Sequence, residues 1–484
     1  MKIIILGAGR VGHSVAESLV SERNDITVID TDAERLRDLE SRFDLRGVVG
    51  SGIDPAVLAE AGAHDTDLLI ACAAQDETNL VCCKVAQIVF NIPTRIARVR
   101  SSGFDDDARL VGPEGFAVDR IICPEESLTR YIGKLIEYPE AMQVREFAGG
   151  RACLASVRAR TGAPMVGHTI AELRADAPDV AVRIVAIYRR FPDEPDRFVA
   201  CDGTTRIEPG DEVFVLAASE HIAHVLAALH RRGATAVQPV RRIMIAGGGR
   251  VGLRLARQLA KQGGRFRVKI IEDDAQRCIE LASLLPADTL VLQGDATDED
   301  LLGDENIEEI DLFLALTDDD ENNIMSCLLA KRLGARRVLA LINRRSYADL
   351  MHGTQIDIAL SPAQAMLGEL LAYVRRGDVQ AVHSLRRGVA EALEIVARGD
   401  RKSSRVVGRK VGELQLPGEV HMGLIVRGLP DSPDVSPEDL REPQVIIPRS
   451  ATVIEGNDHV VFFLPHKRLV REVEKLFRVS ATFF

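Results

Sequence analysis

The sequence begins with Met1-Lys-Ile-Ile-Ile-Leu-Gly-Ala-Gly-Arg-Val-Gly12, an apolar run followed by three glycines at the spacing GxGxxG. This pattern predicts a buried parallel strand that leads through a tight turn into a helix. Gly7 permits the turn, Gly9 lets the backbone approach a pyrophosphate, and Gly12 allows the helix to pack close to the strand. The phosphates would bind the free N–H groups at the start of the helix.

The same pattern recurs as Arg242-Ile-Met-Ile-Ala-Gly-Gly-Gly-Arg-Val-Gly252, so that Gly247 matches Gly7 at an offset of 240 residues. Other matching features follow in the same order and at nearly the same offset. They are Asp30 with Glu272, Gly50-Ser51-Gly52 with Gly294-Asp295-Ala296, Asp76-Glu77-Thr78-Asn79 with Asp320-Glu321-Asn322-Asn323, and Pro124 with Pro362. The chain is therefore predicted to be a tandem duplication of a two-domain module.

Each module is predicted to begin with an α/β domain. In the first module, six short apolar runs separated by helical patterns indicate a doubly wound parallel sheet of the Rossmann type. The predicted strands are Ile3–Leu6, Ile26–Ile29, Arg46–Val49, Asp67–Ala73, Arg95–Val99 and Val118–Ile122, and the predicted helices between them include Asp54–Ala61 and Asp76–Val89. Pro124 then opens a further helix over Glu125–Ile136.

The pattern after Met142 favours strands and predicts a small α+β lobe. Its expected strands are Val144–Phe147, Cys153–Val157, Arg183–Tyr188, Thr204–Ile207 and Glu212–Leu216, its loops are Thr161–Gly167 and Phe191–Asp196, and His221–Arg232 is the closing helix. Val396–Val407 and Ala451–Phe463 echo this lobe in the second module. The expected boundaries are α/β domains over 1–123 and 241–361, crossover helices over 124–141 and 362–380, lobes over 142–232 and 381–484, and a linker over 233–240.

The composition excludes several classes of partner. The formal net charge of the 484 residues is −11, which disfavours binding to nucleic acid or anionic lipid, and the absence of Trp leaves little for base stacking. No apolar run approaches the roughly 20 residues that a membrane helix needs, and no signal-peptide pattern precedes the first strand. The eight Cys lack the spacing of a metal site, so we expect buried free thiols in a reducing cytosol.

The acidic residue after the second predicted strand has two interpretations. Asp30 and Glu272 could accept both hydroxyls of a ribose and repel a 2′-phosphate, or they could cap the following helix. We favour ribose binding, which suits NAD(H) or an adenine nucleotide better than NADP. For the glycines, the alternative is close helix–strand packing without a ligand.

The remaining polar residues give weaker indications. Asp76/Glu77 and Asp318–Glu321 could perform acid–base chemistry or bind a cation, but capping of the next helix is favoured. Arg98 on the fifth strand needs a partner, either a phosphate or a carboxylate at a subunit interface, and the second module has Leu341 or Ile342 near that place. The His residues are expected on the surface. We find no catalytic motif and predict neither a catalytic residue nor a bound metal.

Together these features resemble the RCK (KTN) family of regulatory domains. The lobe sequence Arg183-Ile-Val-Ala-Ile-Tyr188, followed by Thr204–Ile207 and Pro209-Gly-Asp-Glu-Val-Phe-Val215, is similar to the C-terminal RCK subdomain. Two such modules in one chain resemble the peripheral nucleotide-binding subunits of bacterial Trk potassium uptake systems. The resemblance covers essentially the whole chain.

The resemblance implies two nucleotide sites that bind NAD(H), one of which could instead take ATP or ADP. The first would use Gly7, Ala8, Gly9, Arg10, Val11, Gly12, Asp30, Ser51, Ala73 and Arg98. The second would use Gly247, Gly248, Gly249, Arg250, Val251, Gly252, Glu272 and Asp295. Two departures stand out: Ser51 replaces the group that many RCK domains carry near the adenosine, and the second lobe has Met422–Val426 followed by a Pro/Asp-rich insert over 430–443.

The resemblance further implies a cytoplasmic regulatory subunit, peripheral on the inner face of the membrane, that gates a Trk-type potassium-translocating subunit. A homotetramer is expected, with hinges at 125–137 and 363–375. The alternative is an NAD-dependent oxidoreductase. It is disfavoured because neither α/β domain is followed by a His, Lys or Cys constellation in an apolar pocket.

Overall fold

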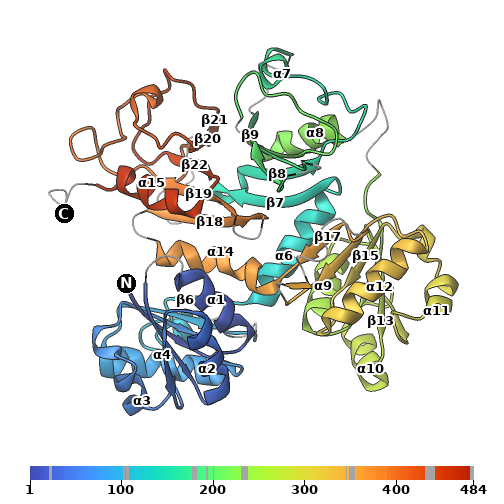
Figure 1. The fold of residues 1–484 in the computed structure, drawn as a ribbon. Coiled ribbons are helices and arrows are strands. Elements are labelled where there is room, and N and C mark those ends of the chain that lie inside the picture. Colours follow the sequence, from blue (N-terminus) through green and yellow to red (C-terminus); the bar gives the residue numbers. More distant parts are fainter. Residues whose placement is uncertain are drawn as a thin grey trace. The chain divides into compact units, whose positions relative to one another are not determined.

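The computed structural model describes residues 1–20, 24–101, 104, 108–176, 182–191, 194–199, 201–230, 238–344, 346–347, 355–375, 378–386, 389–430 and 442–479. The chain divides into two compact units, each made of two separate stretches of sequence (Figure 1). Unit 1 contains Met1–Arg130 and Arg241–Leu370, and unit 2 contains Tyr131–Val240 and Leu371–Phe484. Each unit therefore collects the like domains of the two modules.

The first α/β domain contains a six-stranded sheet in the order β3-β2-β1-β4-β5-β6, and every pair of neighbouring strands is parallel. The strands are β1 (Lys2–Leu6), β2 (Asp25–Asp30), β3 (Arg46–Val49), β4 (Leu68–Ala71), β5 (Thr94–Arg98) and β6 (Arg120–Ile122). The helices are α1 (Arg10–Val20), α2 (Ala33–Arg42), α3 (Pro55–Glu60), α4 (Asp76–Phe90) and α5 (Ala108–Val111). This order is the doubly wound Rossmann arrangement, whose ligands bind where the strand order reverses, between β1 and β4.

The second α/β domain repeats this topology as β14-β13-β12-β15-β16-β17, again parallel throughout. Its strands are β12 (Arg242–Ala246), β13 (Arg267–Glu272), β14 (Leu290–Gln293), β15 (Leu312–Ala315), β16 (Val338–Leu341) and β17 (Ile358–Leu360). Its helices include α9 (Arg250–Ala260), α10 (Ala275–Leu284), α11 (Glu299–Asp304) and α12 (Asp320–Arg332). The matching strand order confirms the predicted fold class and the duplication.

Strand burial explains why the apolar runs stand out in the sequence. All four residues of β4 and of its counterpart β15 are buried, as expected for a strand covered on both faces. The crossover helices follow each domain as α6 (Pro124–Glu137) and α14 (Pro362–Val374). Because unit 1 ends at Arg130 and at Leu370, each helix begins in unit 1 and ends in unit 2.

Unit 2 contains two antiparallel five-stranded sheets of the same topology, β10-β9-β11-β8-β7 and β21-β20-β22-β19-β18. The first lobe comprises β7 (Ala141–Phe147), β8 (Ala152–Arg158), α7 (Ile170–Asp176), β9 (Val182–Arg189), β10 (Arg197–Val199), β11 (Glu212–Ala218) and α8 (Ser219–His230). The second comprises β18 (Val379–Leu385), β19 (Ala390–Val396), β20 (His421–Arg427), β21 (Gln444–Ile446), β22 (His459–Leu464) and α15 (Val470–Phe477). Despite its divergent sequence, Met422–Val426 lies in β20, the counterpart of β9.

Several predicted elements of the lobes differ from the structure. The predicted strand Thr204–Ile207 is wrong: Asp202 accepts hydrogen bonds from the N–H groups of Thr204 and Thr205, so the segment turns and contributes only an isolated bridge at Arg206. The strand of this region is instead β10, which directly follows the predicted loop Phe191–Asp196. Helix α7 is an element that the sequence pattern does not predict. Parts of the Phe191–Asp196 loop and of the closing helix, together with most of the 430–443 insert and of the 233–240 linker, fall on residues outside the described ranges.

Candidate functional site

The first glycine loop combines two closely packed positions with one open position. Gly7 has φ +103°, and a Cβ placed there would lie 2.9 Å from the amide nitrogen of Ala73. A Cβ on Gly12 would lie 1.8 Å from Gly7 O. A Cβ on Gly9, in contrast, would have no neighbouring atom within 4 Å. Packing therefore explains Gly7 and Gly12 but gives no reason for Gly9, which leaves space for a ligand to approach the backbone.

The second loop has the same geometry. Gly247 has φ +101°, a Cβ on Gly252 would lie 2.1 Å from Gly247 O, and a Cβ on Gly249 again would have no neighbour within 4 Å. At the additional glycine, Gly248, a Cβ would lie 2.2 Å from Leu281 Cδ1, so that the Leu281 side chain would have to move. Gly9 and Gly249 directly precede α1 and α9, whose first N–H groups have no partner within the helix. Both loops can therefore receive an anion.

The acidic residues at the ends of β2 and β13 face the glycine loops. Asp30 Oδ2 accepts a hydrogen bond from Ala8 N at 2.6 Å, and Glu272 Oε2 accepts one from Gly248 N at 2.7 Å. The capping alternative is wrong, because α2 and α10 are capped by Asp32 and Asp274. In both copies the carboxylate lies at the loop, where it can accept ribose hydroxyls.

The other predicted site residues lie around this centre. Ser51 and Asp295 follow Gly50 and Gly294, whose N–H groups donate to the carbonyls of Asp30 and Glu272. Ala73 packs against Gly7. The side chains of Arg10 and Arg250 are exposed at the helix starts, Val11 and Gly12 are buried behind the loop, and Val251 is half-buried. The Asp295 carboxylate accepts from Thr297 N and Oγ1, so it shapes its own turn.

A buried asparagine joins neighbouring strands of each sheet. This residue is not among the predicted site residues. Asn79 is fully buried, accepts from Ala73 N, and donates to the carbonyls of Ala73 and Arg98. Asn323 makes the corresponding bonds to Thr317 and Leu341 in the second copy. The sequence signal for both asparagines is the Asp-Glu-x-Asn motif that the two copies share.

The predicted helix cap at Asp76 is wrong, and of the two candidates Asp319 and Asp320 only Asp319 is a cap. Asp76 and Asp320 are the first residues of α4 and α12, but their carboxylates accept from backbone N–H groups beyond β5 and β16. Asp76 binds Arg100 N and Ser101 N, and Asp320 binds Asn343 N and Arg344 N. Asp319, in contrast, is the N-cap of α12, as predicted. The two carboxylates thus fix the chain that leaves the neighbouring strand.

Arg98 has an intramolecular partner. Its Nη2 lies 3.4 Å from Glu125 Oε1 at the start of α6, and both side chains are largely buried. Leu341 occupies the matching place in the second copy, since its carbonyl accepts from Asn323 as that of Arg98 accepts from Asn79. The arginine therefore belongs to the first copy alone and connects its sheet to the crossover helix.

No group of three or more His, Cys, Asp or Glu within the described residues is arranged to hold a metal ion. Six Cys are buried, and burial raises the pKa of Cys72, the thiol beside Gly7, to about 12. The prediction of surface His residues is wrong for His459, which lies 2.6 Å from the buried Glu394, and for His383, whose pKa burial lowers to about 3.

Comparison with known proteins agrees with this architecture. The family model described as TrkA-N domain matches residues 3–124 and 243–362, and the TrkA-C domain matches 154–230. "Trk system potassium uptake protein TrkA" from Halomonas elongata is 47% identical over 484 residues, and that from Vibrio alginolyticus is 46% identical; both alignments cover 100% of each chain. The crystal structure of the GsuK RCK domain matches with a TM-score of 0.58 at 17% identity, covering 98% of this chain and 94% of that one.

The fold and the glycine loops thus define a protein built from two RCK-type modules. The chain belongs to the TrkA family of Trk system potassium uptake proteins. None of the helices in the described ranges is long and apolar enough to cross a bilayer.

Proposed function

We propose that the chain is a regulatory subunit that binds nucleotides in its two α/β domains and thereby gates a Trk-type potassium-translocating membrane subunit. The observation that carries the proposal is the pair of open positions at Gly9 and Gly249, each between closely packed glycines and next to a carboxylate. Ordinary packing would not demand glycine there. The relatives named for potassium uptake support the physiological role.

NAD(H) is the proposed ligand of both sites, and ATP or ADP would compete with it at one of them. A pyrophosphate would lie against the loop and the first turn of α1 or α9, and the ribose would bind Asp30 or Glu272. Ser51, Ala73 and Asp295 would border the adenosine. Support also comes from a solved GsuK channel bound to NAD, which shares the fold at 18% identity with a TM-score of 0.58 and covers 98% of this chain and 78% of that one.

The subunit would act as a cytoplasmic homotetramer, peripheral on the inner membrane face, without catalysing a reaction. An oxidoreductase would need a proton donor beside the nicotinamide, but the carboxylates of Asp30 and Asp76 already accept backbone hydrogen bonds and the thiol of Cys72 has a raised pKa. Nucleotides would shift gating only through different affinities for the open and closed states.

Alanine at the open glycines tests the proposal. Gly9→Ala should weaken NADH binding to the first site at least about tenfold, because the methyl group keeps the pyrophosphate from one or more charge-assisted hydrogen bonds. NADH titration of the full chain, followed by fluorescence, measures this, and Gly249→Ala does the same for the second site. Neither variant should lower the melting temperature.

Potassium flux tests the output. Liposomes containing a Trk-type membrane subunit should change their potassium flux when the full chain and NADH or ATP are added together, and the double variant Gly9→Ala/Gly249→Ala should not respond. Full-strength nucleotide binding by the double variant would contradict the site assignment. A nucleotide-independent flux with intact binding would contradict the gating role.

A further inference from the structure

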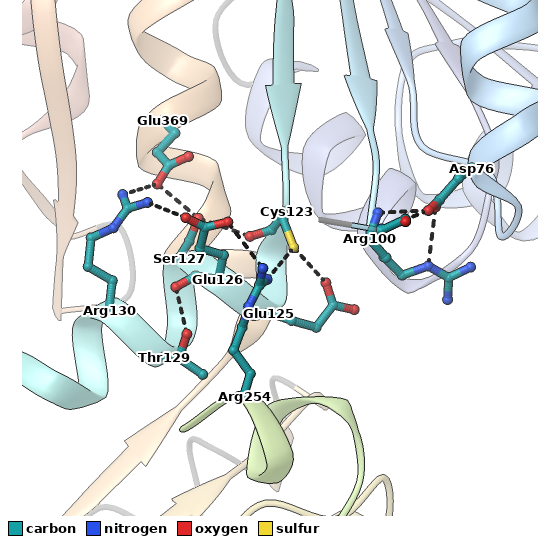
Figure 2. A network of polar contacts seen from close by, with 11 residues as sticks. Asp76, Arg100, Cys123, Glu125, Glu126, Ser127, Thr129, Arg130, Arg254 and Glu369 are labelled. Carbon is teal, nitrogen blue, oxygen red and sulfur yellow. Dashed lines mark hydrogen bonds and ion pairs between the residues drawn. The ribbon is translucent and has the colours of Figure 1, made fainter. Parts of the chain in front are cut away.

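Arg254 extends from the helix of the second glycine loop to the first crossover helix. It is the fifth residue of α9, about 6 Å along the helix axis from Arg250. Its Nη1 lies 3.1 Å from Cys123 Sγ, and its Nη2 lies 3.5 Å from Glu126 Oε2 (Figure 2). Cys123 and Glu126 flank the start of α6, so one guanidinium holds the point where the first α/β domain passes into its crossover helix.

From α6 the contacts continue to the first site. The thiol of Cys123 donates to Glu125 Oε2 at 3.6 Å, and Glu125 Oε1 pairs with Arg98 at the end of β5. The carbonyl of Arg98 accepts from Asn79, which also holds both backbone groups of Ala73. Ala73 in turn packs on Gly7. Each step is a direct contact, so helix α9 is connected to the first glycine loop.

A second set of contacts fixes α6 at the same point. Glu126 Oε1 accepts from Arg130, and Glu369 of α14 accepts from both Arg130 and Ser127, as Figure 2 shows. Glu126 is therefore held between two arginines, one of them Arg254. These contacts connect the position of α9 to the start of α6.

The first module does not carry an arginine at the position that matches Arg254. The residue of α1 that matches Arg254 is Ser14, whose hydroxyl donates to Arg10 O within its own helix. A serine is too short to reach a crossover helix. The two glycine loops match at Arg10 and Arg250 and at Val11 and Val251. The duplicated loop pattern therefore does not account for the arginine at position 254.

We propose that Arg254 is a positioning residue that couples the two nucleotide sites of one chain. An anion bound at the N-terminus of α9 changes the position of this helix, and Arg254 transmits the change through Cys123, Glu125 and Arg98 to the first glycine loop. By linkage, each site changes the affinity of the other by the same factor, for which we expect at least about fivefold. The inference rests on the proposed function.

NADH titration of the full chain tests the coupling. The Gly249→Ala chain reports the first site alone, and the Gly9→Ala chain reports the second. The wild-type isotherm should depart from the sum of these two curves. Arg254→Ala should restore the simple sum, while each single-site affinity, measured in combination with Gly249→Ala or Gly9→Ala, stays unchanged.

Two further variants separate coupling from general damage. Cys123→Ala removes the sulfur that joins Arg254 to Glu125 and should also restore the sum. Arg257→Ala removes an exposed arginine of the same helix and should leave the wild-type departure intact. Additive wild-type binding, NADH binding at only one site, or coupling that survives in Arg254→Ala would overturn the inference while leaving nucleotide binding established. A wild-type chain that does not bind NADH would contradict the proposed function itself.

Discussion

The Asn79 side chain connects two neighbouring strands at the carboxyl edge of the first parallel sheet. Its amide makes three hydrogen bonds to the chain after β4 and to the end of β5, strands that the chain visits before and after α4. A shorter or apolar side chain could fill the space but could not satisfy these backbone groups. The equivalent role of Asn323 indicates that the sheet edge requires it in both copies.

We expect Asn79→Ala to lower the free energy of unfolding of unit 1 by about 2–4 kcal/mol, because three partly buried backbone groups lose their partner. Urea denaturation followed by circular dichroism measures the change. The exposed neighbour Glu77 supplies the control, and Glu77→Ala should change stability by less than about 0.5 kcal/mol. A loss below about 1 kcal/mol for Asn79→Ala would show that water replaces the amide.

Gly12→Ala should destabilise the first α/β domain, whereas Gly9→Ala should not. The new Cβ at Gly12 would lie 1.8 Å from a backbone oxygen, so α1 must shift away from the loop at a cost of about 1–3 kcal/mol or more. Thermal unfolding of both variants checks this contrast. Equal melting temperatures would mean that α1 is not held against the loop.

The sequence supports the residues of this site to different degrees. The glycine spacing and the acid after β2 are local patterns, and the residues that they single out lie together at the loop. The partners of Asp76 and Arg98 are 24 and 27 residues away in sequence and on other elements, so no local pattern could reveal them. Asp76 also fits the sequence rule for a cap, but tertiary contacts take its carboxylate instead.

At the scale of elements, β18 carries a histidine that cannot easily be protonated. His383 Nε2 donates to Glu146 O at 3.1 Å, and its ring packs edge-on against Phe147 at a centroid distance of 5.0 Å. Burial first, and then the charge of Arg145, lower its pKa from 6.5 to about 3. The neutral ring thus joins β18 to the end of β7.

This depressed pKa predicts that unit 2 loses stability in mild acid. Below about pH 6.5 the unfolded chain protonates His383 and the folded chain does not, so stability is present above that pH and falls as the pH drops toward about 3. The contribution lost between about pH 8 and about pH 5 is at most about 2 kcal/mol. His383→Gln should flatten the dependence, measured as the difference between the two urea-denaturation profiles. Parallel profiles would contradict the assignment.

Element prediction succeeded where burial imposes a pattern. The central strands β1 and β4 are buried almost throughout, and the apolar runs of the first sheet were found within about two residues of the observed strand ends. The lobes were harder to predict. Strand β10 has only three residues at a sheet edge, with one exposed and none fully buried, and so it has no apolar signature. Thr204–Ile207 has strand-forming residues but lacks a sheet partner beyond the single bridge at Arg206.

For the whole molecule, the duplication brings like domains together rather than consecutive ones. In unit 2 a single core contains Phe147 and Phe214 from the first lobe and Leu385 and Phe463 from the second. The buried pair of Arg386 and Glu212, 3.1 Å apart, also joins the two lobes. The stability of each lobe therefore depends on residues that lie far away in the sequence.

Arg386→Ala should destabilise unit 2 by about 3–5 kcal/mol, because it leaves the buried carboxylate of Glu212 without its cation. Differential scanning calorimetry of the full chain measures the loss. Arg197→Ala is the control, since that arginine and its partner Glu194 are both exposed, and it should have little effect. Combining Arg386→Met with Glu212→Gln should recover most of the stability. An unaltered melting transition for Arg386→Ala would mean that the lobes do not rely on each other.

The buried thiols have a practical consequence. A solvent-exposed thiolate is the form of cysteine that attacks a thiol reagent, whereas in the native chain Cys82, Cys83, Cys153 and Cys327 are enclosed and have raised pKa values. Their labelling rates therefore record how often the surrounding structure opens. Since they lie in the first α/β domain, the first lobe and the second α/β domain, mass spectrometry of labelled peptides would give a separate opening frequency for each. Labelling of these native cysteines can therefore measure how a bound nucleotide changes the dynamics of each part.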